Sequence, residues 1–146
     1  MAATTGRRLG RDGRSTSALG VGCWAIGGPF EFNGRPAGWG EVDDEVSIRM
    51  IHTAVDAGIR LLDTADVYGA GHSERVVGKA LAQLPESVRA EIVVATKFGN
   101  RFDETTRKAG SQEVTPAVVR DACEGSLVEL IAELRRHHDL CPHALG

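Results

Sequence analysis

Residues 58–69, Gly-Ile-Arg-Leu-Leu-Asp-Thr-Ala-Asp-Val-Tyr-Gly, limit the possible folds of this chain more than any other stretch. The apolar run 59–62 is short and lies between helical patterns, which predicts a buried strand. The strand ends at Asp63, and Tyr68 follows in a loop closed by glycine. An acid at a strand's carboxyl end and a phenol in the next loop both belong to the face where α/β folds hold their catalytic groups.

A second strand of the same kind is predicted about thirty residues later. Residues 91–96, Glu-Ile-Val-Val-Ala-Thr, form it, and Lys97 follows directly. Neighbouring strands lie about 4.8 Å apart. If these two strands are adjacent, Asp63 and Lys97 form an ion pair beside the Tyr68 hydroxyl.

The remaining elements predict a parallel sheet. Residues 18–22 form another strand, preceded by a hairpin over 7–16 with Asp-Gly at its turn. Helices are expected from Asp43 or Asp44 to Gly58, from Ser73 to about residue 84, and from Thr115 onward. Strands and helices that alternate at these short spacings imply right-handed βαβ units, and hence an α/β fold.

Each helix has an apolar stripe that should face the core. In the first helix we expect Val46, Met50, Ile51 and Ala54 to be buried; in the second, Val77, Ala80, Leu81 and Leu84; in the third, Val119, Ala122, Cys123, Leu127, Leu130, Ile131 and Leu134.

Two connections are predicted as loops, and each leaves two interpretations. Residues 27–40 are rich in glycine, proline and aromatic residues, and either shape a pocket over the active face or only pack on its rim. Residues 98–111 are charged and lack periodicity, and are either solvated or in contact with substrate.

Composition and charge argue against a nucleic-acid-binding, membrane-spanning or secreted protein. The chain has 146 residues, which is one domain at most, and its net charge of −3 argues against nucleic acid or an anionic membrane as a partner. No apolar run is long enough for a transmembrane helix, and the first residues lack the apolar core of a signal peptide. Three cysteines without disulfide or zinc spacing suit a reducing compartment, so we expect a cytoplasmic protein.

The residues themselves suggest carbonyl reduction. Tyrosine has an unperturbed pKa of ~10 and is a poor proton donor near neutrality. A lysine cation close to a tyrosine favours the phenolate and brings the phenol nearer to that task. A carboxylate beside the lysine would hold it in place and charged. An acid, a phenol and an ammonium group at one edge therefore make a plausible site for protonating a forming alkoxide.

These motifs resemble those of the aldo-keto reductase family. Residues 58–69 match its hallmark Gly-x-Arg-x-x-Asp-Thr-Ala-x-x-Tyr-Gly throughout, and Thr-Lys-Phe-Gly at 96–99 resembles its lysine motif. Residues 19–24 and 73–81 are similar to its first strand and second helix. The resemblance implies an incomplete TIM (β/α) barrel of about three strand–helix units with an N-terminal β-hairpin. We assign residues 1–134 to this part of a barrel and residues 135–146 to a divergent tail.

The resemblance also implies roles for individual residues. Tyr68 would be the proton donor, Lys97 its tuning cation and Asp63 the group that orients Lys97, with NADPH as hydride donor and an aldehyde or ketone as substrate. Cofactor contacts are expected at Asp63 and after the first strand, at Gly22, Cys23 and Trp24. Trp24 is alternatively a residue of the substrate pocket or of the rim. No metal site is predicted, and no Gly-x-Gly-x-x-Gly follows a strand, which argues against a Rossmann dehydrogenase.

The sequence departs from the family after Leu130. A turn and a strand ending in histidine are expected there, but residues 131–136 continue the helical pattern. His143 falls near the position of that histidine, with Pro142 breaking any strand. Three outcomes stay open: a truncated or frameshifted chain with weak or no activity, self-association through unpaired sheet edges, or a non-catalytic regulatory or interaction module of the same ancestry.

Overall fold

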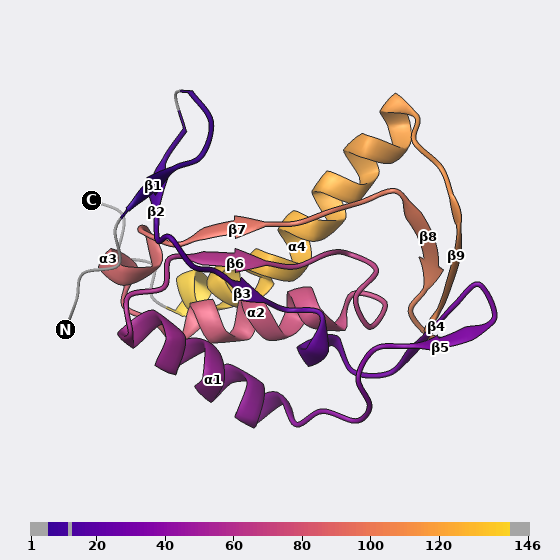
Figure 1. The fold of residues 1–146 in the computed structure, drawn as a ribbon, viewed down its shortest axis with the longest axis horizontal. Helices are drawn as coiled ribbons and strands as arrows, with labels where there is room; N and C mark the ends of the chain where they lie inside the picture. Colours follow the sequence, from indigo (N-terminus) through magenta and orange to yellow (C-terminus); the bar gives the residue numbers. More distant parts are fainter. Residues whose placement is uncertain (1–5, 12, 141–146) are drawn as a thin grey trace.

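The computed structural model describes residues 6–11 and 13–140, and it holds the predicted elements together with several that were not predicted (Figure 1). In chain order the elements are β1 (Arg7–Arg8), β2 (Ser15–Thr16), β3 (Val21–Gly22), the 3₁₀ turn η1 (Ala25–Gly27), β4 (Phe30–Phe32), β5 (Arg35–Ala37), α1 (Asp44–Asp56), β6 (Leu61–Asp63), α2 (His72–Ala82), α3 (Glu86–Arg89), β7 (Val93–Ala95), β8 (Asn100–Asp103), β9 (Lys108–Gln112) and α4 (Pro116–Leu140). Among the helices of this described part, none is both long and apolar enough to cross a membrane.

Three parallel strands form the centre of the fold, in the order β3-β6-β7. Gly22 pairs with Asp63, and Asp63 pairs with Ala95, so the three strands end at one level. A helix follows each strand, which confirms the predicted α/β class: an incomplete (β/α) barrel of three strand–helix units. We call β3, β6 and β7 with α1, α2 and α4 the barrel segment.

The core of the barrel segment lies between the sheet and its helices. Figure 1 shows α1 and α2 on the same side of the strands. Ile51 of α1, Leu62 of β6, and Val76 and Val77 of α2 are fully buried there. Burying one such side chain stabilises the folded state by about 1.5–3 kcal/mol. This layer of buried side chains is therefore a major source of the stability of the fold.

The predicted first helix is present, but its inner face differs from the prediction. The Asp43 side chain accepts a hydrogen bond from the Val46 N–H at 3.0 Å and caps α1 as expected. Val46 and Met50 are nevertheless exposed, and the buried side chains are Ser47, Ile48, Ile51 and Val55. Ile48, Ile51 and Val55 follow the i, i+3, i+7 rule equally well, so periodicity alone did not distinguish the two faces.

The apolar stripe predicted for α4 is also partly wrong. Cys123 and Leu127 are exposed, whereas Val118, Ser126 and Leu130 are buried. The helix starts as predicted, with the Val118 N–H donating to the Thr115 hydroxyl, and its backbone continues through residues 131–136. Contact with α2 selects the buried face of α4, and that contact is not visible in the sequence. His143 lies outside the described residues.

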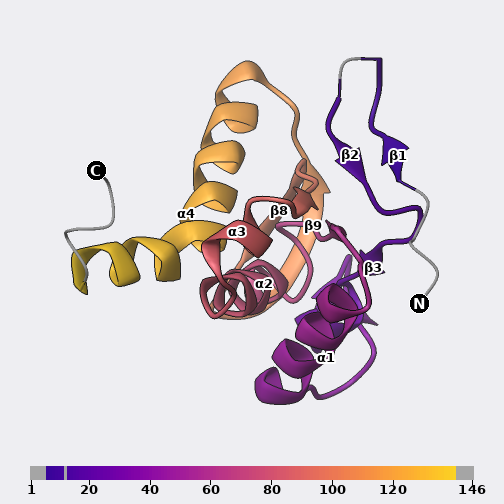
Figure 2. The ribbon, with the colours of Figure 1, turned by 90° about the vertical axis from the view of Figure 1, so that its left-hand side faces the viewer.

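The N-terminal hairpin lies at the end of the strands opposite to Asp63. β1 and β2 pair antiparallel, which confirms the predicted hairpin, and Figure 2 shows the two strands beside each other and apart from the helices. Ser17 accepts a hydrogen bond from the Arg60 N–H, and Arg14 donates to the Ala90 carbonyl at 2.6 Å. Both contacts tie this region to the beginnings of β6 and β7, so the carboxyl ends of the strands stay clear of it (Figure 1).

A second sheet stands at the carboxyl end of the barrel strands, and we call it the rim sheet. Its order is β5-β4-β9-β8, with the central pair β4 and β9 parallel. Residues 27–40 and 98–111 were predicted as loops, and these predictions are wrong where each segment forms the strands of a hairpin. The strands are three to five residues long and mostly polar, and they become a sheet only when the two hairpins pair with each other.

Candidate active site

The predicted site residues lie along the carboxyl edge of the parallel sheet. The ladder continues beyond the strands: the Cys23 N–H donates to the Asp63 carbonyl at 2.8 Å, and the Asp66 N–H donates to the Lys97 carbonyl at 3.1 Å. These bonds fix the backbone on both sides of Asp63. The side chains that follow the three strands are therefore held at one rim.

Asp63, Lys97 and Tyr68 meet at this rim, as the sequence predicted. The Lys97 ammonium lies 2.8 Å from the Asp63 carboxylate and 2.7 Å from the Thr64 carbonyl. It also lies 5.0 Å from the centroid of the Tyr68 ring. The ammonium is thus shared between a carboxylate, a carbonyl and a phenol.

Lys97 is held in its charged form by these neighbours. Partial burial lowers the pKa of Lys97, but hydrogen bonds to Asp63 and Tyr68, together with their charges, outweigh it and raise the pKa above the usual value. The side chains of Asp63 and Lys97 are each about half exposed, at 48% and 50%. An ion pair this exposed contributes little to stability.

Close backbone contact fixes the loop that carries Tyr68. Gly69 has a φ of 62°, and a side chain there would strike the Gly27 carbonyl oxygen. A side chain at Gly27 would in turn meet the Tyr68 backbone at 2.8 Å. Two glycines thus let the loop lie directly on η1, where the Trp24 ring stacks on Tyr68 with centroids 5.7 Å apart and planes inclined by 13°.

A buried hydroxyl pair supports the same loop from below, and it was not predicted. Ser73 donates to the Cys23 carbonyl at 2.7 Å, so the Thr64 hydroxyl is the donor in its 2.9 Å bond to Ser73. Both hydroxyl residues are fully buried. Ser73 was expected to open α2, but the helix begins at His72 and Gly71 is its N-cap. Two small hydroxyl residues next to apolar runs were the only signal in the sequence.

The residues after β3 differ in what they offer to a ligand. The Cys23 side chain is fully buried, and burial together with the Asp63 charge raises its pKa to about 12, so it is not a reactive thiol. Only the backbone of Cys23 faces the rim. Gly22 is exposed, and a side chain added there would meet nothing within 4 Å. Trp24 is 44% exposed. The edge beside Asp63 is accordingly open and flat.

An aromatic pocket of about 570 Å³ lies beside Tyr68, between the barrel segment and the rim sheet. Trp39 meets Trp24 edge to face, with centroids 6.2 Å apart. The lining residues are Trp24, Phe30, Phe32, Arg35, Pro36, Ala37, Gly38, Trp39, Val67 and Tyr68. Of the two interpretations of residues 27–40, the pocket-forming one is confirmed, and Trp24 lines this pocket.

Comparison with known proteins gives a consistent result. The sequence profile described as "Aldo/keto reductase family" matches residues 18–133. The probable aldo-keto reductase 1 of Glycine max is 38% identical over 86% of this chain and 33% of its own length. The NADH-specific methylglyoxal reductase of Escherichia coli is 36% identical over 84% of this chain and 37% of its own length.

Solved structures agree with the sequence matches. The glycerol dehydrogenase AKR11B4 of Gluconobacter oxydans superposes with a TM-score of 0.67 at 42% identity, covering 89% of this chain and 36% of the dehydrogenase. The chain spans 23–37% of the length of three curated relatives that it matches.

Proposed function

Because this chain belongs to the aldo/keto reductase family of oxidoreductases, we propose that its exposed rim is a site for the reduction of small aldehydes or ketones to alcohols. One observation carries the proposal: the Lys97 ammonium lies between the Asp63 carboxylate, at 2.8 Å, and the Tyr68 ring, at 5.0 Å from its centroid.

In this proposal Tyr68 donates its hydroxyl proton to the substrate oxygen. When bound, a nicotinamide cofactor would supply the hydride that adds to the carbonyl carbon. The Lys97 cation stabilises the phenolate that remains after the proton has left, and Asp63 orients Lys97. The aromatic pocket beside Tyr68 receives the apolar part of the substrate and excludes water from it.

The rim fits the nicotinamide end of such a cofactor. Gly22 leaves open space beside Asp63, and the Trp24 ring is a flat wall next to Tyr68. The sequence contains no glycine-rich phosphate loop after a strand that would hold the pyrophosphate. We expect weak cofactor affinity and weak turnover from this chain, which spans 33% and 37% of the length of two of its relatives. NADPH is the cofactor that the family resemblance implies. NADH is the alternative, because one relative is the NADH-specific methylglyoxal reductase of Escherichia coli.

Turnover of methylglyoxal with NADPH or NADH by the 146-residue chain tests the proposal. Tyr68→Phe should lower turnover at least about 100-fold, because it removes the proton donor and keeps the ring that stacks on Trp24. Cofactor binding, followed by quenching of Trp24 and Trp39 fluorescence, should be preserved. Equal turnover by the Phe variant would refute the role of Tyr68.

Lys97→Met should lower turnover similarly, and Lys79→Met is its matched control. Lys79 makes a comparable exposed ion pair, 3.1 Å from Asp44, but on the outer side of α2. Loss of activity in both variants would indicate a general charge effect and contradict the proposed role of Lys97.

A non-catalytic binding module of the same ancestry is the second candidate. β3 and β7 are the edge strands of the described parallel sheet, and their unpaired sides suit another chain or a second copy. Cofactor binding without turnover by the wild-type chain, together with a concentration-dependent increase in mass, would favour this candidate.

A further inference from the structure

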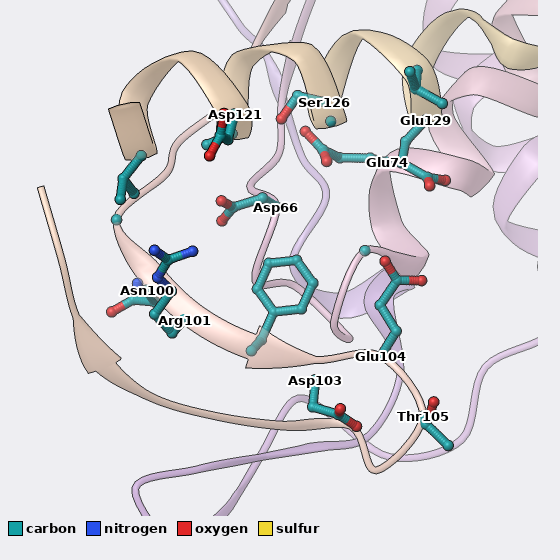
Figure 3. A pocket seen from close by; sticks show the side chains of 17 residues that line it. Asp66, Glu74, Asn100, Arg101, Asp103, Glu104, Thr105, Asp121, Ser126 and Glu129 are labelled. Carbon is teal, nitrogen blue, oxygen red and sulfur yellow. The ribbon is translucent and has the colours of Figure 1, made fainter. Parts of the chain in front are cut away.

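A second cavity, of about 640 Å³, lies between β8, the first half of α4 and the start of α2 (Figure 3). We call it the acid-lined pocket, because six carboxylates line it: Asp66, Glu74, Asp103, Glu104, Asp121 and Glu129. Its lining arginine, Arg101, is bound to Glu113 at 2.9 Å. The pocket is separate from the aromatic pocket and is not used by the proposed reduction.

Asp66, at the base of the acid-lined pocket, has one carboxylate oxygen without a hydrogen-bond partner. Its residue is only 7% exposed, and its Oδ1 atom has no hydrogen bond. Figure 3 shows the Asp66 and Glu74 carboxylates facing the same space from a loop and from α2. An unpaired buried carboxylate oxygen is costly, and such a group in a folded protein calls for a ligand or a functional explanation.

Three other carboxylates around the pocket already have partners. Glu74 accepts from the Thr96 hydroxyl at 2.6 Å. Glu104 and Glu129 share Arg75, at 3.0 and 3.5 Å. These bonds leave the negative charge at Asp66 uncompensated within the part of the chain that the structure describes.

The lining residues favour an organic cation over a metal ion. Within the described residues, no group of three or more histidine, cysteine, aspartate or glutamate side chains is placed to hold a metal. The wall between the acids is partly apolar and includes Phe102, Val118, Ala122 and Val128. Apolar walls suit an alkyl chain, and an aromatic ring beside a carboxylate suits an ammonium group.

We propose that the acid-lined pocket binds an alkylammonium compound, with Asp66 as the buried partner of the ammonium group and Asp121 as a second carboxylate on α4. The pKa of Asp66 is raised to about 6. Burial is the largest cause, the hydrogen bond from the Val67 N–H opposes it, and the negative charge of Glu74 raises the pKa further. The carboxylate is charged at neutral pH, so affinity should fall as the pH is lowered through about 6.

Calorimetric titration of the full chain with 1,5-diaminopentane at pH 7.5 and constant ionic strength tests this proposal. We expect one binding site for the diamine and none for neutral 1-pentanol. Asp66→Asn keeps the shape of the side chain and should weaken binding about tenfold or more, the size of one charge-assisted hydrogen bond. Asp56→Asn, at an exposed position of α1, is the control and should bind like wild type.

A second pair of variants, both on α4, distinguishes binding of the diamine in the acid-lined pocket from general attraction of the diamine to negative charge on the protein. Asp121→Asn removes a lining carboxylate, whereas Glu124→Gln removes an exposed one that does not line the pocket. We expect weaker binding only for Asp121→Asn. No binding by wild type, or equal losses in all four variants, would overturn the proposal. Binding unaffected by Asp66→Asn in a variant with an unchanged circular dichroism spectrum would also overturn it.

Discussion

The barrel segment and the rim sheet are held together by different interactions. In the barrel segment, helices pack on a parallel sheet and bury Ile51, Leu62 and Val76 completely. In the rim sheet, two polar hairpins pair through β4 and β9, and the buried apolar residues there are Phe30 and Ala109. The barrel segment therefore provides stability and a fixed edge, and the rim sheet shapes the pockets on that edge.

The largest expected effect is the loss of a core side chain from the barrel segment. Leu62→Ala should lower the free energy of unfolding by about 2–5 kcal/mol, because Leu62 is fully buried. Val114→Ala, which follows β9 and is 69% exposed, should change it by less than about 0.5 kcal/mol. Urea unfolding measures both, and similar losses would show that the two regions share one core.

Asp66 lies where the two regions meet, and it should make stability depend on pH. Its pKa is about 6 in the folded protein against an ordinary value of 3.8, so the folded state holds this proton more tightly. Stability should thus rise as the pH falls from about 6 toward about 4, by at most about 3 kcal/mol.

Asp66→Asn should remove the part of this dependence that Asp66 contributes, and the buried Glu74, whose pKa is also raised, leaves a remainder of the same sign. Unfolding of both proteins in amine-free buffers between pH 7 and 4 measures it. The difference in stability between wild type and variant should shift in favour of wild type at low pH. A difference that stays constant over this range would contradict the assignment.

A pair of glycine variants tests how tightly the helices of the barrel segment pack. A side chain at Gly78 of α2 would meet the Glu129 carbonyl oxygen of α4 at 2.6 Å, so Gly78→Ala should cost about 1–3 kcal/mol. Gly125 of α4 has nothing within 4 Å, and Gly125→Ala should stabilise by up to about 1 kcal/mol. Thermal unfolding compares them, and the same sign for both would argue against close contact between α2 and α4.

The smallest expected effect concerns the link between the two regions. Arg107, in the β8–β9 turn, donates to His72 Nδ1 at 2.9 Å, so His72 Nε2–H donates to Asp44 at 2.7 Å. Arg107→Ala should cost about 1 kcal/mol and speed hydrogen exchange in β8 and β9 more than in β6.

Lys108→Ala is the control for this link. Lys108 is 61% exposed and lies 3.7 Å from Glu31, so its loss should change exchange little. Uniformly faster exchange in Arg107→Ala would mean that the rim sheet and the barrel segment open together.

The elements with a local signal in the sequence are present in the structure as predicted. The strand before Asp63, the strand before Lys97 and the Asp43 cap were predicted from apolar runs and capping residues, and each is present. The contact of Asp63 with Lys97 was also predicted, because parallel neighbouring strands bring their ends together. The roles of these side chains in catalysis stay predictions.

Features that depend on a partner distant in the chain differ from the predictions or were not predicted. The strands of the rim sheet are too short and polar to be recognised alone, and β4 pairs with β9 about seventy-five residues away. The buried face of α4 and the donor role of Ser73 also depend on what lies opposite.

The amino-acid sequence by itself determined the strands and helices of the barrel segment, because hydrophobic periodicity acts over a few residues. It also determined that Asp63, Tyr68 and Lys97 lie at one edge of the sheet, because neighbouring parallel strands run in the same direction. Only the tertiary structure decided that two loops join into a sheet, that Trp24 and Trp39 line a pocket, and that Asp66 is buried with one carboxylate oxygen unpaired. These features arise from pairing and burial between segments far apart in the chain, and no local pattern encodes which segments will meet.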